Sequence, residues 1–287
     1  NIDLSVGSVV CFVGAVGGKM MVTNEMNPYL SIIVMLLVGL LIGAWQGFWI
    51  AYVRIPPFIV TLAGMLVFRG LSNVVLEGMT LAPMPDNFLA LFNNYIPDFF
   101  GMEGFNMTCF LVGVVVCVLY VFMVLKGRAS RAKKGYRVEP FGGVLIKMIV
   151  ICAAVLAFMF RLAQYKGIPN SLVWIVLVIA VYTYIASKTT VGRYFYAVGG
   201  NEKATKLSGI NTEKVFFWVY TNMGILSAIA GIVLSARNAS ATPKAGDGFE
   251  MDAIASCYIG GAATSGGIFI DMAIHDIDLM RWFLGSD

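Results

Sequence analysis

The chain has 287 residues, of which 59% are hydrophobic and 13% charged, with a formal net charge of +4 and a mean hydropathy of +0.82. Soluble domains carry about 25% charged residues, so the composition excludes soluble, secreted and disordered classes and indicates an integral membrane protein. The basic residues stand beside apolar runs, which is typical of the cytoplasmic side of a membrane protein rather than of a nucleic-acid-binding face.

Seven stretches are long and apolar enough to span a membrane, which takes about 20 residues per helix. In chain order they cover residues 4–23, 30–53, 55–76, 108–126, 146–162, 171–187 and 215–236. An eighth stretch, about 252–270, is interrupted by glycines. We therefore predict an all-α fold, a polytopic transmembrane helical bundle with broken or re-entrant helices.

Two loops of opposite charge orient these spans. The loop at 77–107 has four acidic residues and neither lysine nor arginine, whereas 126–137 has six basic residues and no acid. By the positive-inside rule the first loop lies outside and the second inside. The same count of crossings places the basic segment 188–214 inside.

Three apolar segments contain residues that break a regular helix. Residues 2–8 hold an acid and two hydroxyls, residues 55–58 hold two prolines, and residues 255–267 are rich in glycine and hydroxyl side chains. Irregular backbone persists in a membrane only where protein or a water-filled cavity satisfies it, which indicates a polar path of the transporter type. The alternative is that small residues simply let helices pack closely. The candidate lining residues of the path are Asp3, Ser5, Ser8, Thr61, Ser256 and Thr264.

The inner segment 191–211 is too polar to span the membrane and has the pattern of a short capped helix. Asn201 suits the N-cap position, Glu202 favours the positive N-terminal end, and Gly209 favours a left-handed stop. Asn211 is placed to cap the seventh span. We interpret the segment as a small docking element, with an ordinary connector as the alternative.

Several motifs, in order along the chain, resemble one known family. Besides the inner segment they are Asp3-Leu4-Ser5-Val6-Gly7-Ser8, Trp45-Gln46-Gly47-Phe48-Trp49, residues 57–65, Arg69-Gly70 and residues 252–255. Over residues 1–267, the chain resembles the membrane permease subunit of bacterial ABC importers for monosaccharides. Xylose-type and multiple-sugar permeases look most similar.

The resemblance implies a monosaccharide pathway through the lipid of the bacterial cytoplasmic (inner) membrane, formed by two permease copies as a homodimer. It also implies two cytoplasmic ABC ATPase subunits and a periplasmic sugar-binding protein as partners, with no nucleic acid. Since the ATPase partner hydrolyses ATP, we expect this chain to be no enzyme and to bind no cofactor or metal. The resemblance places the ATPase-coupling contact within 188–214, at Gly192, Arg193, Gly199, Gly200, Asn201, Glu202, Lys203, Leu207, Ser208 and Gly209.

The C-terminal tail, 268–287, resembles a different family, the inositol-type NAD-dependent dehydrogenases. The match implies that Asp271 and His275 stand at an active-site aspartate and histidine, but no glycine-rich dinucleotide motif follows any strand in this chain. We expect residues 1–267 to form a transmembrane permease domain that is incomplete at both ends, because family members have helices before and after it. A fragment or fusion related to the dehydrogenase and an ion-coupled secondary transporter remain the alternatives.

Overall fold

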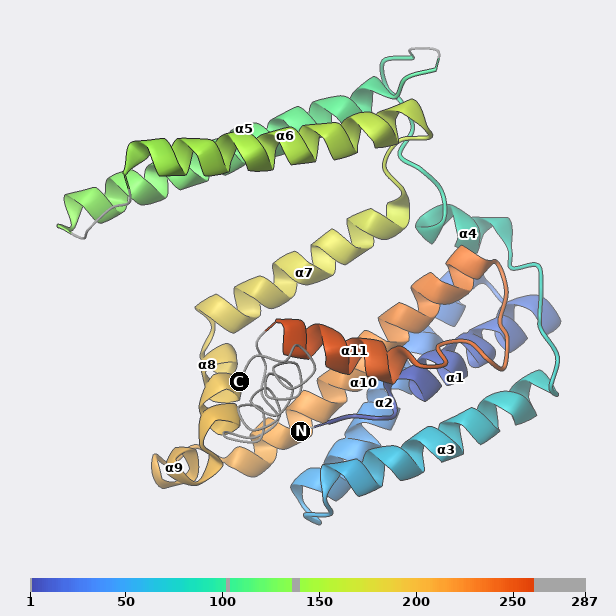
Figure 1. Ribbon diagram of the computed structural model, residues 1–287. Helices are drawn as coiled ribbons and strands as arrows, with labels where there is room; N and C mark the ends of the chain where they lie inside the picture. Colours follow the sequence, from blue (N-terminus) through green and yellow to red (C-terminus); the bar gives the residue numbers. More distant parts are fainter. Residues whose placement is uncertain (1, 102–103, 136–139, 261–287) are drawn as a thin grey trace, which may run out of the picture. The chain divides into compact units, whose positions relative to one another are not determined.

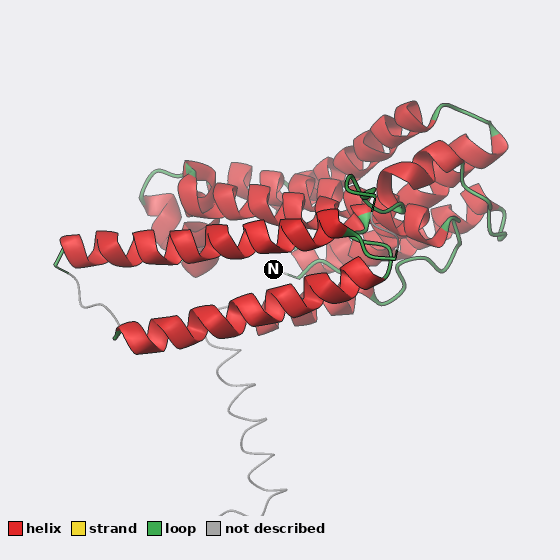
Figure 2. Ribbon diagram, turned by 90° about the horizontal axis from the view of Figure 1, so that it is seen from above, coloured by secondary structure: helices red, strands yellow, loops and turns green. Residues whose placement is uncertain are grey.

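The computed structural model describes residues 2–101, 104–135 and 140–260. Within these ranges the chain is helical and forms no strand beyond two isolated bridges (Figures 1 and 2). The predicted all-α class is confirmed. The elements are α1 (Val6–Gly18), a π-helical turn (Lys19–Thr23), α2 (Pro28–Ala51), α3 (Pro57–Leu76), α4 (Asp86–Phe92), α5 (Met107–Lys133), α6 (Phe141–Gln164), α7 (Asn170–Lys188), α8 (Thr190–Gly200), α9 (Glu202–Leu207), α10 (Thr212–Asn238) and α11 (Phe249–Ile259).

Seven of the described helices are long and apolar enough to cross a membrane, and they match the seven predicted spans. The fourth one differs most, because α5 runs on to Lys133 instead of ending near residue 126. Lysine and arginine are good helix formers, and their charge suits the negative end of a helix. The first part of the predicted eighth stretch belongs to α11, which has 11 residues and is not one of these seven helices, and the part after residue 260 lies outside the described residues.

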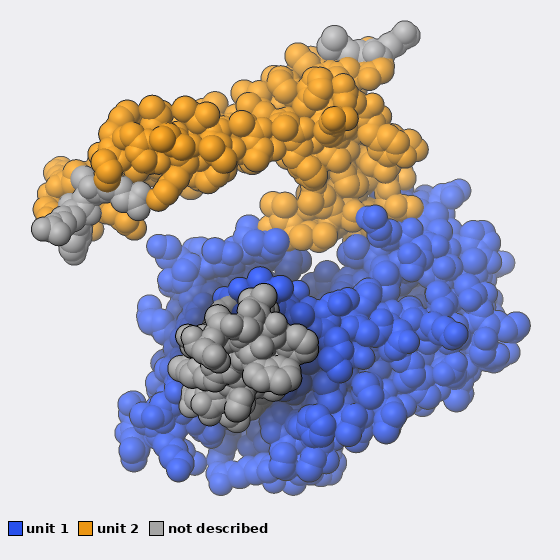
Figure 3. All heavy atoms as spheres, viewed as in Figure 1, with its two compact units in different colours: residues 1–90, 178–287 blue, residues 91–177 orange. Residues whose placement is uncertain are grey.

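The chain forms two compact units, residues 1–90 with 178–287 and residues 91–177 (Figure 3). In the second unit α5 packs against α6, and the side chain of Asn106 caps α5 by accepting a hydrogen bond from Cys109 N at 2.8 Å. In the first unit α1, α2, α3 and α10 pack together. The candidate site residues all lie in the first unit or outside the described residues.

Glycines bring α2 and α10 of the first unit into backbone contact. A Cβ on Gly43 would lie 2.6 Å from the carbonyl oxygen of Tyr220, and one on Gly224 would overlap the carbonyl oxygen of Gly39. Small residues at such crossings are the usual way in which membrane helices pack closely. The two helices therefore pack backbone against backbone.

Candidate functional site

The segment that is predicted to lie inside folds as two short helices, α8 and α9, followed directly by α10. The side chain of Asn201 caps α9 by accepting a hydrogen bond from Ala204 N at 3.0 Å, and that of Asn211 caps α10 by accepting one from Lys214 N at 2.9 Å. Gly209 has a φ of +82°, in the left-handed region. The predicted caps and the left-handed stop are confirmed.

Helix α8 was missed by the sequence analysis. It begins after Thr189, whose hydroxyl caps it by accepting a hydrogen bond from Gly192 N at 3.2 Å. The available signal was the spacing of its large apolar residues at i, i+3, i+4 and i+7, which is typical of an amphipathic helix. These residues are Val191, Tyr194, Phe195 and Val198.

Most of the predicted coupling residues lie on the surface of this helix pair. Gly192 is buried, whereas Arg193, Gly199, Gly200, Asn201, Glu202, Lys203, Leu207, Ser208 and Gly209 are exposed. Leu207 is 89% exposed, which is unusual for a large apolar side chain and leaves it free to contact another protein.

An ion pair ties the helix pair to the end of α2. Glu213 Oε1, in the first turn of α10, lies 2.5 Å from Arg54 Nη2 and 3.8 Å from Lys206 Nζ of α9. Arg54 has a φ of +63°, so the chain turns sharply at this residue between α2 and α3. This contact could not be predicted from the sequence, because the two charges lie 159 positions apart.

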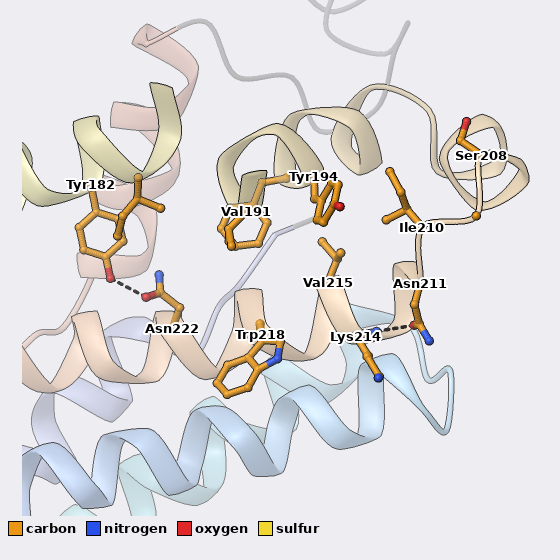
Figure 4. A pocket seen from close by; sticks show the side chains of 13 residues that line it. Tyr182, Val191, Tyr194, Ser208, Ile210, Asn211, Lys214, Val215, Trp218 and Asn222 are labelled. Atoms are coloured by element: carbon orange, nitrogen blue, oxygen red, sulfur yellow. Dashed lines mark hydrogen bonds between the residues drawn. The ribbon is translucent and has the colours of Figure 1, made fainter. Parts of the chain in front are cut away.

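A pocket of about 740 Å³ lies next to α8 (Figure 4). It is lined by residues from the end of α7, from α8, from the connection between α9 and α10, and from the start of α10. Its walls are mainly aromatic and apolar and include Tyr194, Ile210 and Trp218. At one end the hydroxyl of Tyr182 donates a 2.5 Å hydrogen bond to Asn222 Oδ1. The segment that joins α9 to α10 therefore borders open space rather than a packed core.

Three of the six predicted path residues meet at the N-terminal end of α1. Asp3 Oδ1 accepts hydrogen bonds from Ser5 N at 2.8 Å and Ser5 Oγ at 2.7 Å, and Ser8 Oγ donates to Ser5 O at 2.7 Å. Ser5 Oγ also accepts a 2.9 Å bond from Nε2 of Gln46, a buried residue of α2. Burial raises the pKa of the Asp3 carboxyl above its usual range, while the hydrogen bonds from Ser5 act to lower it.

The other three predicted path residues are placed differently. Thr61 is fully buried on α3, one turn before Gly64, which faces the Gln46 amide. Ser256 is exposed on α11, and its hydroxyl donates to the carbonyl oxygen of Asp252 at 2.7 Å within the same helix. Thr264 lies outside the described residues, as do Asp271 and His275 of the tail.

Two further polar residues near this cluster were missed by the sequence analysis. Tyr220 of α10 and Glu250 of α11 are buried, and each has a side-chain oxygen without a hydrogen-bond partner among the described residues. The signal for Glu250 was an acid directly before a glycine-broken span, since carboxylates at membrane depth are rare and mostly functional. A functional role of Tyr220 could not be predicted, because a tyrosine at the start of a span is typical of the aromatic belt at the membrane interface.

Comparison with known proteins gives consistent matches over nearly the whole chain. The family described as branched-chain amino acid transport system, permease component, matches residues 1–274. The xylose transport system permease protein of Escherichia coli (strain K12) is 37% identical over 268 residues, which is 93% of this chain and 66% of that protein. The corresponding protein of Haemophilus influenzae is 35% identical over 271 residues, 93% of this chain and 69% of that protein.

A ribose permease is more distant. The ribose import permease protein of Escherichia coli (strain K12) is 32% identical over 268 residues, 93% of this chain and 63% of that protein. The chain thus spans about two thirds of the length of the curated relatives that it matches. No solved structure matches the chain.

Proposed function

This chain belongs to the family of the branched-chain amino acid transport system permease component, and from that premise we propose that it forms half of the pathway of an ATP-driven monosaccharide importer. The proposed cargo is xylose or a related sugar, because the most similar of the relatives described above are xylose permeases. The proposed partners are a second permease copy, two cytoplasmic ABC ATPase subunits and a periplasmic sugar-binding protein.

Family membership agrees with several of the sequence-based predictions. It confirms the predicted resemblance to a permease subunit and the multi-pass location in a bacterial membrane. The family is one of transport components rather than enzymes, in which the ATPase is a separate subunit. The identity of the sugar belongs to the proposal.

The observation that carries the proposal is the exposed, capped helix pair α8–α9 and its ionic tie to α2. Force applied at Leu207 reaches α10 through Glu213 and reaches α2 through Arg54. Because glycines bring the backbones of α2 and α10 into contact, we expect the two helices to move together. ATPase closure can thus rearrange the helices around the path, which is the coupling that alternating access requires.

The proposed path begins at the polar cluster on α1. Asp3, Ser5 and Ser8 form one hydrogen-bonded network with Gln46, a residue of the α2–α10 pair. A shift of that pair therefore reaches the network directly. Within the proposal Thr61 lines the same region from α3, while Ser256 and Thr264 are candidates from the segment that begins with α11.

Reconstitution of the complete importer tests the proposal. The chain, co-expressed with its ATPase and its sugar-binding protein, should carry radiolabelled D-xylose into proteoliposomes only when ATP is hydrolysed. Leucine uptake in place of sugar uptake would reassign the cargo to amino acids. Uptake driven by a proton or sodium gradient without the ATPase would support the ion-coupled transporter, and inositol-dependent reduction of NAD by the purified chain would support the dehydrogenase.

A further inference from the structure

Three buried side-chain atoms have no hydrogen-bond partner among the described residues: Trp49 Nε1, Tyr220 OH and Glu250 Oε2. Tyr220 is only 3% exposed and Glu250 only 9%. Buried polar groups are nearly always paired, because leaving one unpaired costs its full desolvation energy. A buried group without a partner calls for a water molecule, an ion or a ligand to supply the missing hydrogen bond.

Glu250 lies against the first turn of α1. A Cβ on Gly7 would overlap both Glu250 Oε2 and the carbonyl oxygen of Gly246, so only glycine leaves room for the carboxylate here. The N-terminal end of a helix carries a partial positive charge, which stabilises a carboxylate beside it. Gly7 also lies between Ser5 and Ser8, which belong to the polar cluster.

Tyr220 approaches the same cluster from α10. Its ring is buried with Ile50 and Val60, and Trp49 packs against this group. Ile50 lies one turn after Gln46 on α2, and Val60 lies one turn before Gly64, which faces the Gln46 amide, so Tyr220 packs about one helical turn from the Ser5–Gln46 network. Tyr220 is thus placed beside the Ser5–Gln46 network, and Glu250 beside Gly7 of α1.

The chemistry of the three unpaired groups selects the kind of ligand. A carboxylate accepts hydrogen bonds, an indole N–H donates them, and a phenol does both. None of the three is basic, so an anion or the carboxylate of an amino acid finds no cationic partner among them. A neutral polyol fits, because each of its hydroxyls both donates and accepts, and the aromatic rings can cover its C–H face.

We propose that the N-terminal end of α1 is a carbohydrate-binding site in which Glu250 and Tyr220 contact ligand hydroxyls and the Asp3–Ser5–Gln46 network borders the ligand. The inference rests on the proposed importer function and deepens it, since it names the residues that would recognise a neutral sugar through hydrogen bonds. In the structure described here these groups are closed off from solvent, as one state of an alternating-access cycle requires.

The test uses the reconstituted complex with D-xylose and its monodeoxy derivatives as probes. Glu250→Gln should slow ATP-driven xylose uptake about tenfold, the usual effect of losing one hydrogen bond to a charged group. The wild type should transport the derivative that lacks the contacted hydroxyl about tenfold more slowly than xylose, whereas Glu250→Gln should transport both at similar rates. Tyr220→Phe should likewise erase the discrimination at a different hydroxyl.

Matched controls separate ligand contact from a general structural effect. Glu25→Gln and Tyr29→Phe make the same chemical changes at exposed positions and should keep wild-type rates and preferences. If the Glu250→Gln variant fails to insert into the membrane, the discrimination between xylose and its derivatives by Tyr220→Phe decides the test. Wild-type preference among the derivatives in both inserted variants would overturn the inference alone, whereas a wild type that moves no sugar would overturn the importer function together with it.

Discussion

Arg54, in the turn that follows α2, and Glu213, in the first turn of α10, form an ion pair with 2.5 Å between Nη2 and Oε1. Both side chains are partly solvated, and such pairs contribute about 0–1 kcal/mol to stability. Their importance therefore lies in position, because Glu213 also lies 3.8 Å from Lys206 of α9. The pair links the exposed helix α9 to the helix that carries Gln46.

Reversing the charge of Arg54 should uncouple ATP hydrolysis from transport. In Arg54→Glu two carboxylates face each other, so we expect several-fold more ATP hydrolysed per sugar moved, with insertion unchanged. The double variant Arg54→Glu/Glu213→Arg should recover part of the coupling, since it restores an opposite pair. A control is Glu77→Gln, which breaks the 2.8 Å ion pair with Lys19 elsewhere in the same unit and should leave the ratio unchanged.

Changes in the α8–α9 pair should weaken association with the ATPase. Reversing the charges of Arg193 and Glu202 together inverts two exposed charges of this surface. Gly209→Val places a β-branched residue at a φ of +82°, at a cost of about 1–3 kcal/mol. We expect reduced co-purification with the ATPase and reduced uptake, and Gly70→Ala as a control should change neither. Undiminished coupling with all three changes would remove these residues from the ATPase contact.

The orientation of the chain can be tested by cysteine labelling. In a background without the native cysteines, Asn87→Cys should react with an impermeant thiol reagent added outside whole cells, and Ser130→Cys should react only after the membrane is opened. Both positions are exposed in the structure, so accessibility within the protein does not limit either reaction. The reverse pattern would invert the topology.

Gly224→Ala should destabilise the packing of α2 against α10. The added Cβ overlaps the carbonyl oxygen of Gly39, which is backbone and can yield only if the helices separate. Overpacking of this kind typically costs about 1–3 kcal/mol, so thermal unfolding in detergent should occur at a lower temperature. Gly127→Ala, with no atom within 4 Å of its Cβ, should leave the unfolding temperature equal or higher, because alanine is the better helix former.

Local features of this protein could be predicted from its sequence because they depend on neighbouring residues. The seven spans could be predicted from runs of apolar side chains. The thickness of the bilayer sets the length that a spanning helix needs, about 20 residues. The caps at Asn201 and Asn211 and the left-handed Gly209 follow from side chains and backbone within a few residues of each helix end. The predicted path residues Asp3, Ser5 and Ser8 could be named together because they are close in the chain.

Contacts between distant segments were decided by the tertiary structure alone. Ser5 meets Gln46 across 41 positions, Arg54 meets Glu213 across 159, and Glu250 lies on Gly7. A membrane span that is apolar on every side has no amphipathic pattern. Its sequence therefore does not indicate which face contacts another helix and which contacts lipid. Helix rotation is set by where glycines allow backbones to approach, and that depends on both partners at once, so no single stretch of sequence contains it.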